Sequence, residues 1–69
     1  MNVLLNGERR ELPERATVAA AVEASGAESA GGGLAVAVDG DVVPRGSWEQ
    51  TTLEEGQRVE VLRAVQGGA

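Results

Sequence analysis

A single helical segment divides the strand-forming parts of this chain into two groups, and this order restricts the possible folds more than any other feature. The segment covers residues 18–25, with Thr17 as the expected N-cap and Gly26 as the residue that stops the helix. Its apolar positions recur at i, i+3, i+4 and i+7, so one narrow stripe is predicted to pack inward. The residues of this stripe are Val18, Ala21, Val22 and Ser25.

The other segments have the pattern of strands joined by tight turns. Before the helix, two short runs flank Asn6-Gly7, a pair that favours the positive φ angles of a two-residue hairpin turn. After the helix, residues 34–38 alternate large and small side chains with period two, and Asp39-Gly40 marks a second hairpin. Residues 59–65 form the last predicted strand.

The resulting order is strand, strand, helix and three strands, which predicts an α+β fold with one sheet and one helix across a single face. This is the order of a β-grasp: one mixed sheet of four to five strands whose first and last strands lie side by side in parallel. Residues 1–65 are expected to form this domain, and residues 66–69 a flexible C-terminal tail. The strand residues expected to meet the helix are Val3, Leu5, Leu34, Val36, Val38, Val59 and Val61.

Two leucines are out of phase with this inward set. Leu4 and Leu62 are predicted to lie on the other face of the sheet, which so short a chain cannot cover with a second layer. Exposed leucines on an open face indicate a surface for docking a partner. The alternative is that two leucines on a sheet surface are ordinary and have no role.

The residue types that are absent narrow the chemistry. The 69 residues include no cysteine and no histidine, so disulfides, thiolate nucleophiles, imidazole bases and soft metal ligands are excluded, and no metal site is predicted. Val, Leu and Ala supply nearly all of the core, which leaves little room for an internal ligand cavity. An enclosed active site is therefore not expected, and a role as the substrate or binding partner of a larger protein is favoured over an enzyme.

The net charge of the chain restricts the kinds of molecule that it can bind. Eleven acidic residues against six arginines give a net charge of −5, which argues against binding to nucleic acid or to anionic membranes. The charge fits a basic docking surface on a protein partner, although it could equally serve solubility alone. No apolar run approaches the ~20 residues of a membrane-spanning helix and no signal-peptide pattern is present, so a cytoplasmic location is expected.

The C-terminal Gly67-Gly68 pair directly follows the last strand region. Two residues without Cβ form a thin, flexible segment that can enter a narrow channel. ATP can activate a carboxylate at the end of such a segment as an acyl-adenylate, which a nucleophile then attacks. The alternative is a frayed terminus without function, because chain ends are commonly glycine-rich and disordered.

The sequence resembles the thiamine sulfur carrier family over nearly its whole length. The Val-Pro-Arg…Trp segment is the more specific signal, since diglycine tails occur across all ubiquitin-like carriers. The segments that carry the resemblance are 3–7 (VLLNG), 34–38 (LAVAV), 42–45 (VVPR), Trp48, 55–61 (EGQRVEV) and 65–68 (VQGG).

The resemblance implies that a ubiquitin-activating-like adenylyltransferase uses ATP to adenylate the carboxylate of Gly68, with Gln66 and Gly67 recognised as part of the tail. A sulfur donor enzyme carrying a persulfide then converts it to a thiocarboxylate, and thiazole synthase receives the sulfur. The carrier itself binds no cofactor and catalyses nothing. Two alternatives stay open: a carrier for molybdopterin or another thiolated metabolite, and a non-catalytic ubiquitin-like interaction module.

One residue departs from the family pattern. The family ends at the second glycine, whereas Ala69 follows Gly68 here. Related carriers with residues beyond the diglycine are trimmed by a protease, so a trimming protease is an expected partner. A partner that tolerates alanine is the alternative.

Overall fold

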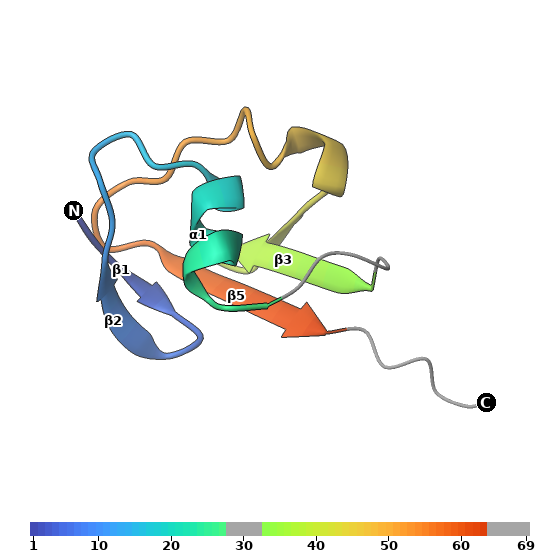
Figure 1. Cartoon of the computed structure of the whole chain (residues 1–69), viewed down its shortest axis with the longest axis horizontal. Helices are drawn as coiled ribbons and strands as arrows, with labels where there is room; N and C mark the ends of the chain where they lie inside the picture. The colour runs from blue at the N-terminus through green and yellow to red at the C-terminus, as the bar shows by residue number, and fades with distance from the viewer. Residues whose placement is uncertain (28–32, 64–69) are drawn as a thin grey trace.

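The fold was obtained as a computed structural model that describes residues 1–27 and 33–63. Its elements follow the predicted order of two strands, a helix and three strands (Figure 1). They are β1 (Asn2–Leu5), β2 (Glu8–Glu11), α1 (Val18–Ala24), β3 (Leu34–Val38), β4 (Asp41–Val43), the short 3₁₀ helix η1 (Arg45–Ser47) and β5 (Arg58–Arg63).

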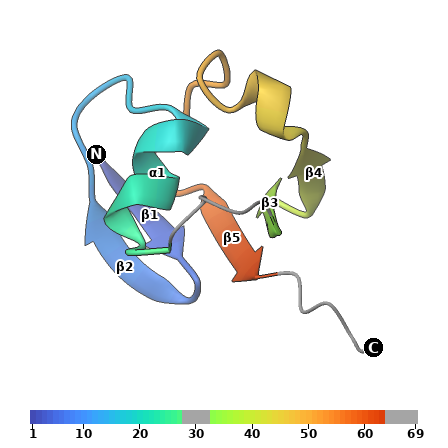
Figure 2. The same cartoon turned by 45° about the vertical axis from the view of Figure 1, so that its right-hand side comes forward.

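The five strands form one mixed sheet in the order β2-β1-β5-β3-β4. The first and last strands are adjacent and parallel, with Leu4 opposite Arg58 and Leu5 opposite Val59, as predicted. The other three strand pairs are antiparallel. Figures 1 and 2 show α1 lying across one face of this sheet, so the β-grasp prediction is confirmed.

Both predicted hairpin turns are present. Asn6 and Gly7 have φ angles of 52° and 84°, and Asp39 and Gly40 have φ angles of 50° and 89°. Positive φ at both central residues defines the turn whose twist matches that of the flanking strands, and Asn, Asp and Gly are the residues that adopt it at least cost.

The helix begins at its predicted cap and ends one residue earlier than predicted. The Thr17 hydroxyl accepts a hydrogen bond from the Ala20 N–H at 3.3 Å, so the cap is confirmed. The last helical residue is Ala24. Ser25 forms the C-cap and Gly26 follows with a φ of 80°, the left-handed conformation that commonly ends a helix.

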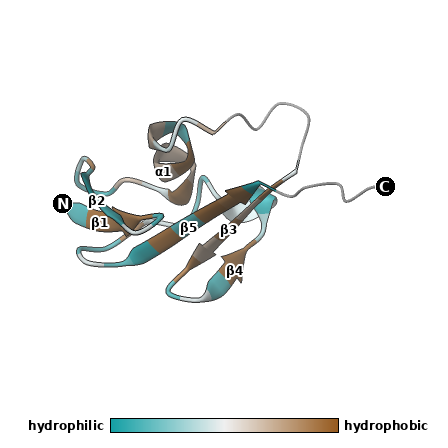
Figure 3. Cartoon of the chain, turned by 90° about the horizontal axis from the view of Figure 1, so that it is seen from below, coloured by the Kyte–Doolittle hydropathy of each residue, from teal (hydrophilic) through white to brown (hydrophobic). Residues whose placement is uncertain are grey.

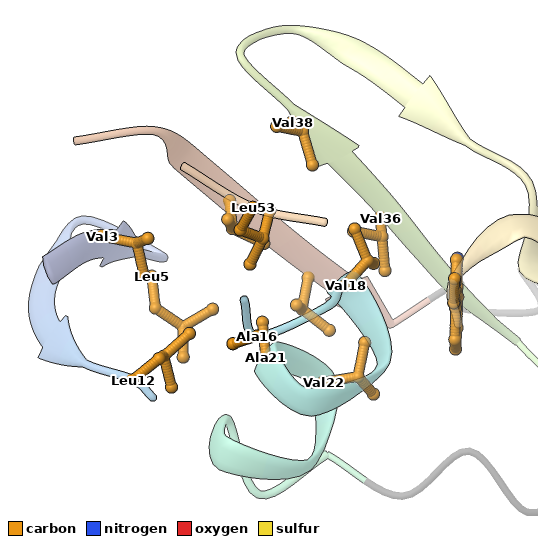
Figure 4. Close-up of a cluster of buried hydrophobic side chains, with 13 residues drawn as sticks. Val3, Leu5, Leu12, Ala16, Val18, Ala21, Val22, Val36, Val38 and Leu53 are labelled. Carbon is orange, nitrogen blue, oxygen red and sulfur yellow. The ribbon is translucent and has the colours of Figure 1, made fainter. Parts of the chain in front are cut away.

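The core is a single layer of side chains between α1 and the sheet (Figure 4). All the strand residues predicted to face the helix are buried, except Leu34, which is half-buried. Three further core residues lie in loops, where no periodicity predicts their burial: Leu12, Ala16 and Leu53. Leu53 lies in the core because its N–H donates a hydrogen bond to the Ala16 carbonyl at 2.8 Å. This bond holds the segment after η1 against the start of α1.

Candidate functional site: the open sheet face

The face of the sheet opposite α1 carries exposed apolar side chains. Val3 and Leu5 of β1 and Val61 of β5 are buried under the helix, so the residues between and after them point the other way. Leu4 is 38% exposed and Leu62 is 60% exposed. The strand phase predicted for both leucines is therefore confirmed.

Leu62 is part of a larger apolar surface. It lies opposite Ala35 of β3, and the next outward residue of β3, Ala37, lies opposite Val42 of β4. Val42 is 74% exposed, the highest value among the exposed large hydrophobic residues of the described chain. Figure 3 shows hydrophobic colour along β3, over part of β4 and along much of β5. We call the four residues Ala35, Ala37, Val42 and Leu62 the open-face patch.

Leu4 lies on the same face but outside this patch. Its neighbours across the strands are Arg9 of β2 and Arg58 of β5. It borders a shallow hollow of about 390 Å³. The residues that line this hollow are Asn2, Val3, Leu4, Arg9, Glu55 and Gly56. Leu4 lies beside Arg58, and Glu60 stands between Arg58 and Leu62 on the same side of β5. The two leucines that were predicted to form one docking face are therefore not adjacent.

Val42 is the residue of this surface that the sequence analysis missed. The signal was present in the turn, because a two-residue Asp39-Gly40 loop pairs Val38 with Asp41. That register places Val43 opposite the buried Val36 and leaves Val42 on the other face.

Charged side chains border the open-face patch. Glu60 lies opposite Ala37, between Arg58 and Leu62 along the outward side of β5, and it is exposed. An apolar centre with a charged rim is the usual composition of a protein–protein interface. Arg58 lies on the same side of β5 as Glu60, so the charge around the patch is mixed.

The predicted tail residues Gln66, Gly67 and Gly68 lie outside the described residues, as does Ala69. The described chain ends at Arg63, the last residue of β5 and the neighbour of Leu62 in sequence. In the sequence, Leu62 of the open-face patch stands four residues before Gln66, the first residue of the predicted tail.

Trp48 lies on the helix side of the sheet and has a structural role there. It is buried, its Nε1–H donates to the Val43 carbonyl at 2.9 Å, and the Arg45 guanidinium lies 5.5 Å from the ring centroid. Trp48 therefore closes one edge of the core. A second open hollow, of about 410 Å³, lies beside it. Its lining is formed by Ala19, Val22, Glu23, Arg45, Gly46, Trp48, Glu49 and Gln50.

Within residues 1–27 and 33–63, no group of three or more His, Cys, Asp or Glu side chains is placed to hold a metal ion. In the same described residues, no helix is long and apolar enough to cross a membrane.

Three comparisons with known proteins were made, and the two that found a match agree. A sequence comparison with functionally curated proteins found no significant match. Among solved structures, a thiamine biosynthesis protein (ThiS) from Geobacter metallireducens superposes with a TM-score of 0.80 at 28% sequence identity, over 99% of this chain and 100% of that chain. The sequence profile of the ThiS family matches residues 3–68, nearly the whole chain including the diglycine. The chain therefore belongs to the ThiS family.

Proposed function

We propose that this protein is a sulfur carrier of thiamine biosynthesis whose Gly68 carboxylate is adenylated, converted to a thiocarboxylate and used to supply sulfur for thiazole formation. The observation that carries the proposal is the family match, which continues through the last strand to Gly68 and so includes both tail glycines. The β-grasp fold and the similarity to a thiamine biosynthesis protein along the whole chain support the same assignment.

The chemistry requires little from the carrier beyond its terminal carboxylate. An oxygen of that carboxylate attacks the α-phosphate of ATP and releases pyrophosphate. The outer sulfur of a donor persulfide then attacks the acyl carbon, displaces AMP and leaves an acyl disulfide between carrier and donor. A second thiol, which this cysteine-free chain cannot supply, attacks the donor sulfur of that S–S bond, so the thiocarboxylate leaves and a disulfide forms on the donor side. Glycine suits the reacting position because it has no Cβ to block a narrow channel. ATP binds to the adenylyltransferase, and the carrier is a reusable co-substrate that catalyses none of these steps.

The open sheet face is the proposed docking surface for both the adenylyltransferase and thiazole synthase. The face includes Leu4 and the open-face patch, and Leu62 of that patch lies six residues before Gly68 in the sequence. A partner that covers the patch would thus lie next to the segment that enters its active site. The two contacts reinforce one another, because docking holds the reactive end at high local concentration.

The test is ATP–pyrophosphate exchange by the adenylyltransferase of the same organism. Three forms of the carrier are compared: one that ends at Gly68, one that ends at Ala69, and Gly68→Val in the shorter form. One extra residue lengthens the reach by about 3.5 Å, which exceeds the misplacement of ~1 Å that can cost a reaction 10²-fold. We expect efficient exchange only with the form that ends at Gly68.

Equal rates for the Gly68-ended and Ala69-ended forms would contradict the need for trimming. Equal rates for all three would remove the diglycine from the mechanism. Intact mass spectrometry of the carrier after incubation with the adenylyltransferase, ATP, the sulfur donor and a thiol reductant provides the second readout, since the thiocarboxylate differs by one oxygen replaced with sulfur. Transfer of that sulfur to thiazole synthase and not to a molybdopterin synthase would identify the pathway.

A further inference from the structure

The Asn6 side chain, in the first turn of the chain, bonds to the backbone of the last strand. Strand β1 ends at Leu5, where the Asn6-Gly7 turn sends the chain away from β5. The hydrogen-bonding between β1 and β5 nevertheless continues for one more residue, because the Asn6 side chain bonds to β5 where the backbone of a longer β1 would have done so. Its Oδ1 accepts a hydrogen bond from the Val61 N–H at 2.8 Å, and its Nδ2 donates to the Val61 carbonyl at 3.3 Å.

This position requires a residue that tolerates positive φ and a side chain that has both a hydrogen-bond donor and an acceptor, and asparagine meets both requirements. The φ of 52° favours Asn, Asp or Gly. Of these three, only asparagine carries a donor and an acceptor together, which is what a backbone N–H and C=O both need. Aspartate would bring an oxygen against the Val61 carbonyl, and glycine would supply nothing.

The contact lies near the last described residues of β5, at the end of the strand that is nearer the tail in sequence. Val61 is followed by Leu62 of the open-face patch and stands seven residues before Gly68. On its other side β5 pairs with β3, through Val36 opposite Val61 and Leu34 opposite Arg63. Without Asn6, β3 would be the only described strand holding this end of β5, and strand ends held on one side open readily.

We infer that Asn6 is a positioning residue that fixes the start of the tail relative to the open-face patch, so that a docked partner receives the Gly68 carboxylate at a set distance. This inference rests on the proposed function. A frayed end of β5 would have to be ordered again on docking, which weakens binding. Once the complex has formed, the reacting geometry is the same, so the chemical step keeps its rate. The loss should appear in KM and not in kcat.

The chain offers a matched control at the other end of β5. Asp39 is also the first residue of a two-residue turn, with a φ of 50°. Its Oδ1 accepts from the Arg58 N–H at 3.0 Å, far from the tail in sequence. Asn6→Gly and Asp39→Gly both keep a residue that tolerates positive φ, and each removes two side-chain hydrogen bonds. Asn6→Gly loses both bonds to Val61, and Asp39→Gly loses the bond from Arg58 and a bond from the Gln57 side chain at 3.2 Å.

Three measurements are made on both variants in the form that ends at Gly68: urea unfolding, amide hydrogen exchange at Val61, and carrier KM and kcat in ATP–pyrophosphate exchange. We expect similar losses of stability in the two variants. Only Asn6→Gly should speed exchange of the Val61 amide, by roughly tenfold or more, and raise KM by about tenfold at unchanged kcat.

An unchanged Val61 exchange rate in Asn6→Gly would overturn the inference, as would an equal rise of KM in both variants or a fall in kcat alone. If the unaltered carrier supports no exchange at all, the proposed function fails and the inference fails with it. If the unaltered carrier is active and Asn6→Gly is equally active, the inference alone is overturned.

Discussion

Substitution of Leu62 by glutamate separates the role of this residue in folding from its proposed role in docking. The side chain is 60% exposed, so folding removes only two-fifths of its surface from water. Full burial of a leucine is worth about 2 kcal/mol, which limits the lost stability to about 1 kcal/mol. For a domain of this size, that corresponds to a fall in Tm of about 4–8 °C.

The remaining three-fifths of the side chain is what a docked partner would cover. Its burial is worth about 1.2 kcal/mol, which is close to a tenfold change in affinity. Glutamate adds the cost of removing a carboxylate from water, and it increases the acidic charge beside Glu60. We therefore expect Leu62→Glu to weaken binding of the adenylyltransferase or thiazole synthase at least tenfold, and Leu62→Gln to weaken it less.

Isothermal titration calorimetry with either partner measures the affinity, and thermal unfolding followed by circular dichroism measures the stability. Val61 provides the contrast, because it is buried and points to the opposite face. Val61→Glu should prevent folding, since it places a carboxylate in the core. If Leu62→Glu also unfolds the protein, the assigned strand phase is wrong. If it folds and binds both partners normally, the docking surface lies elsewhere.

Two further predictions concern stability. Trp48→Phe should lower the free energy of unfolding, measured in urea, by about 1–3 kcal/mol, because the Val43 carbonyl loses its hydrogen-bond donor at 2.9 Å. A change below about 0.5 kcal/mol, roughly the minimum expected net value of one hydrogen bond, would show that water replaces the lost donor. Thr17→Ala should cost about 1 kcal/mol by leaving the Ala20 N–H uncapped, whereas Thr17→Ser should be nearly neutral; equal losses in both would show that the hydroxyl cap contributes nothing.

Much of the fold could be predicted because local signals and the global pattern agree. The Asn-Gly and Asp-Gly pairs define hairpins through φ angles that few residues adopt, and the alternation of residues 34–38 defines a strand with one buried face. The helix stripe and its Thr17 cap follow from spacing and from a side-chain acceptor. Leu53 could not be predicted, because it enters the core from an irregular segment through a backbone contact with distant Ala16.

The candidate site, too, was predicted from the sequence only in part. The sequence predicted which face Leu4 and Leu62 occupy, because side chains alternate along any strand. It did not predict that Leu62 lies with Val42 while Leu4 lies among arginines. That outcome depends on strand order and register across the sheet.

By itself, then, the sequence determined which segments become strands, which residues face the helix, and that Ala69 follows the Gly67-Gly68 pair. These properties are local, since they arise from backbone preferences and from the periodicity of neighbouring residues. Only the tertiary structure decided which outward residues join into the open-face patch and that the Asn6 side chain reaches Val61, 55 residues away. Such contacts depend on which strands become neighbours, and the packing of the whole chain against one helix selects that arrangement.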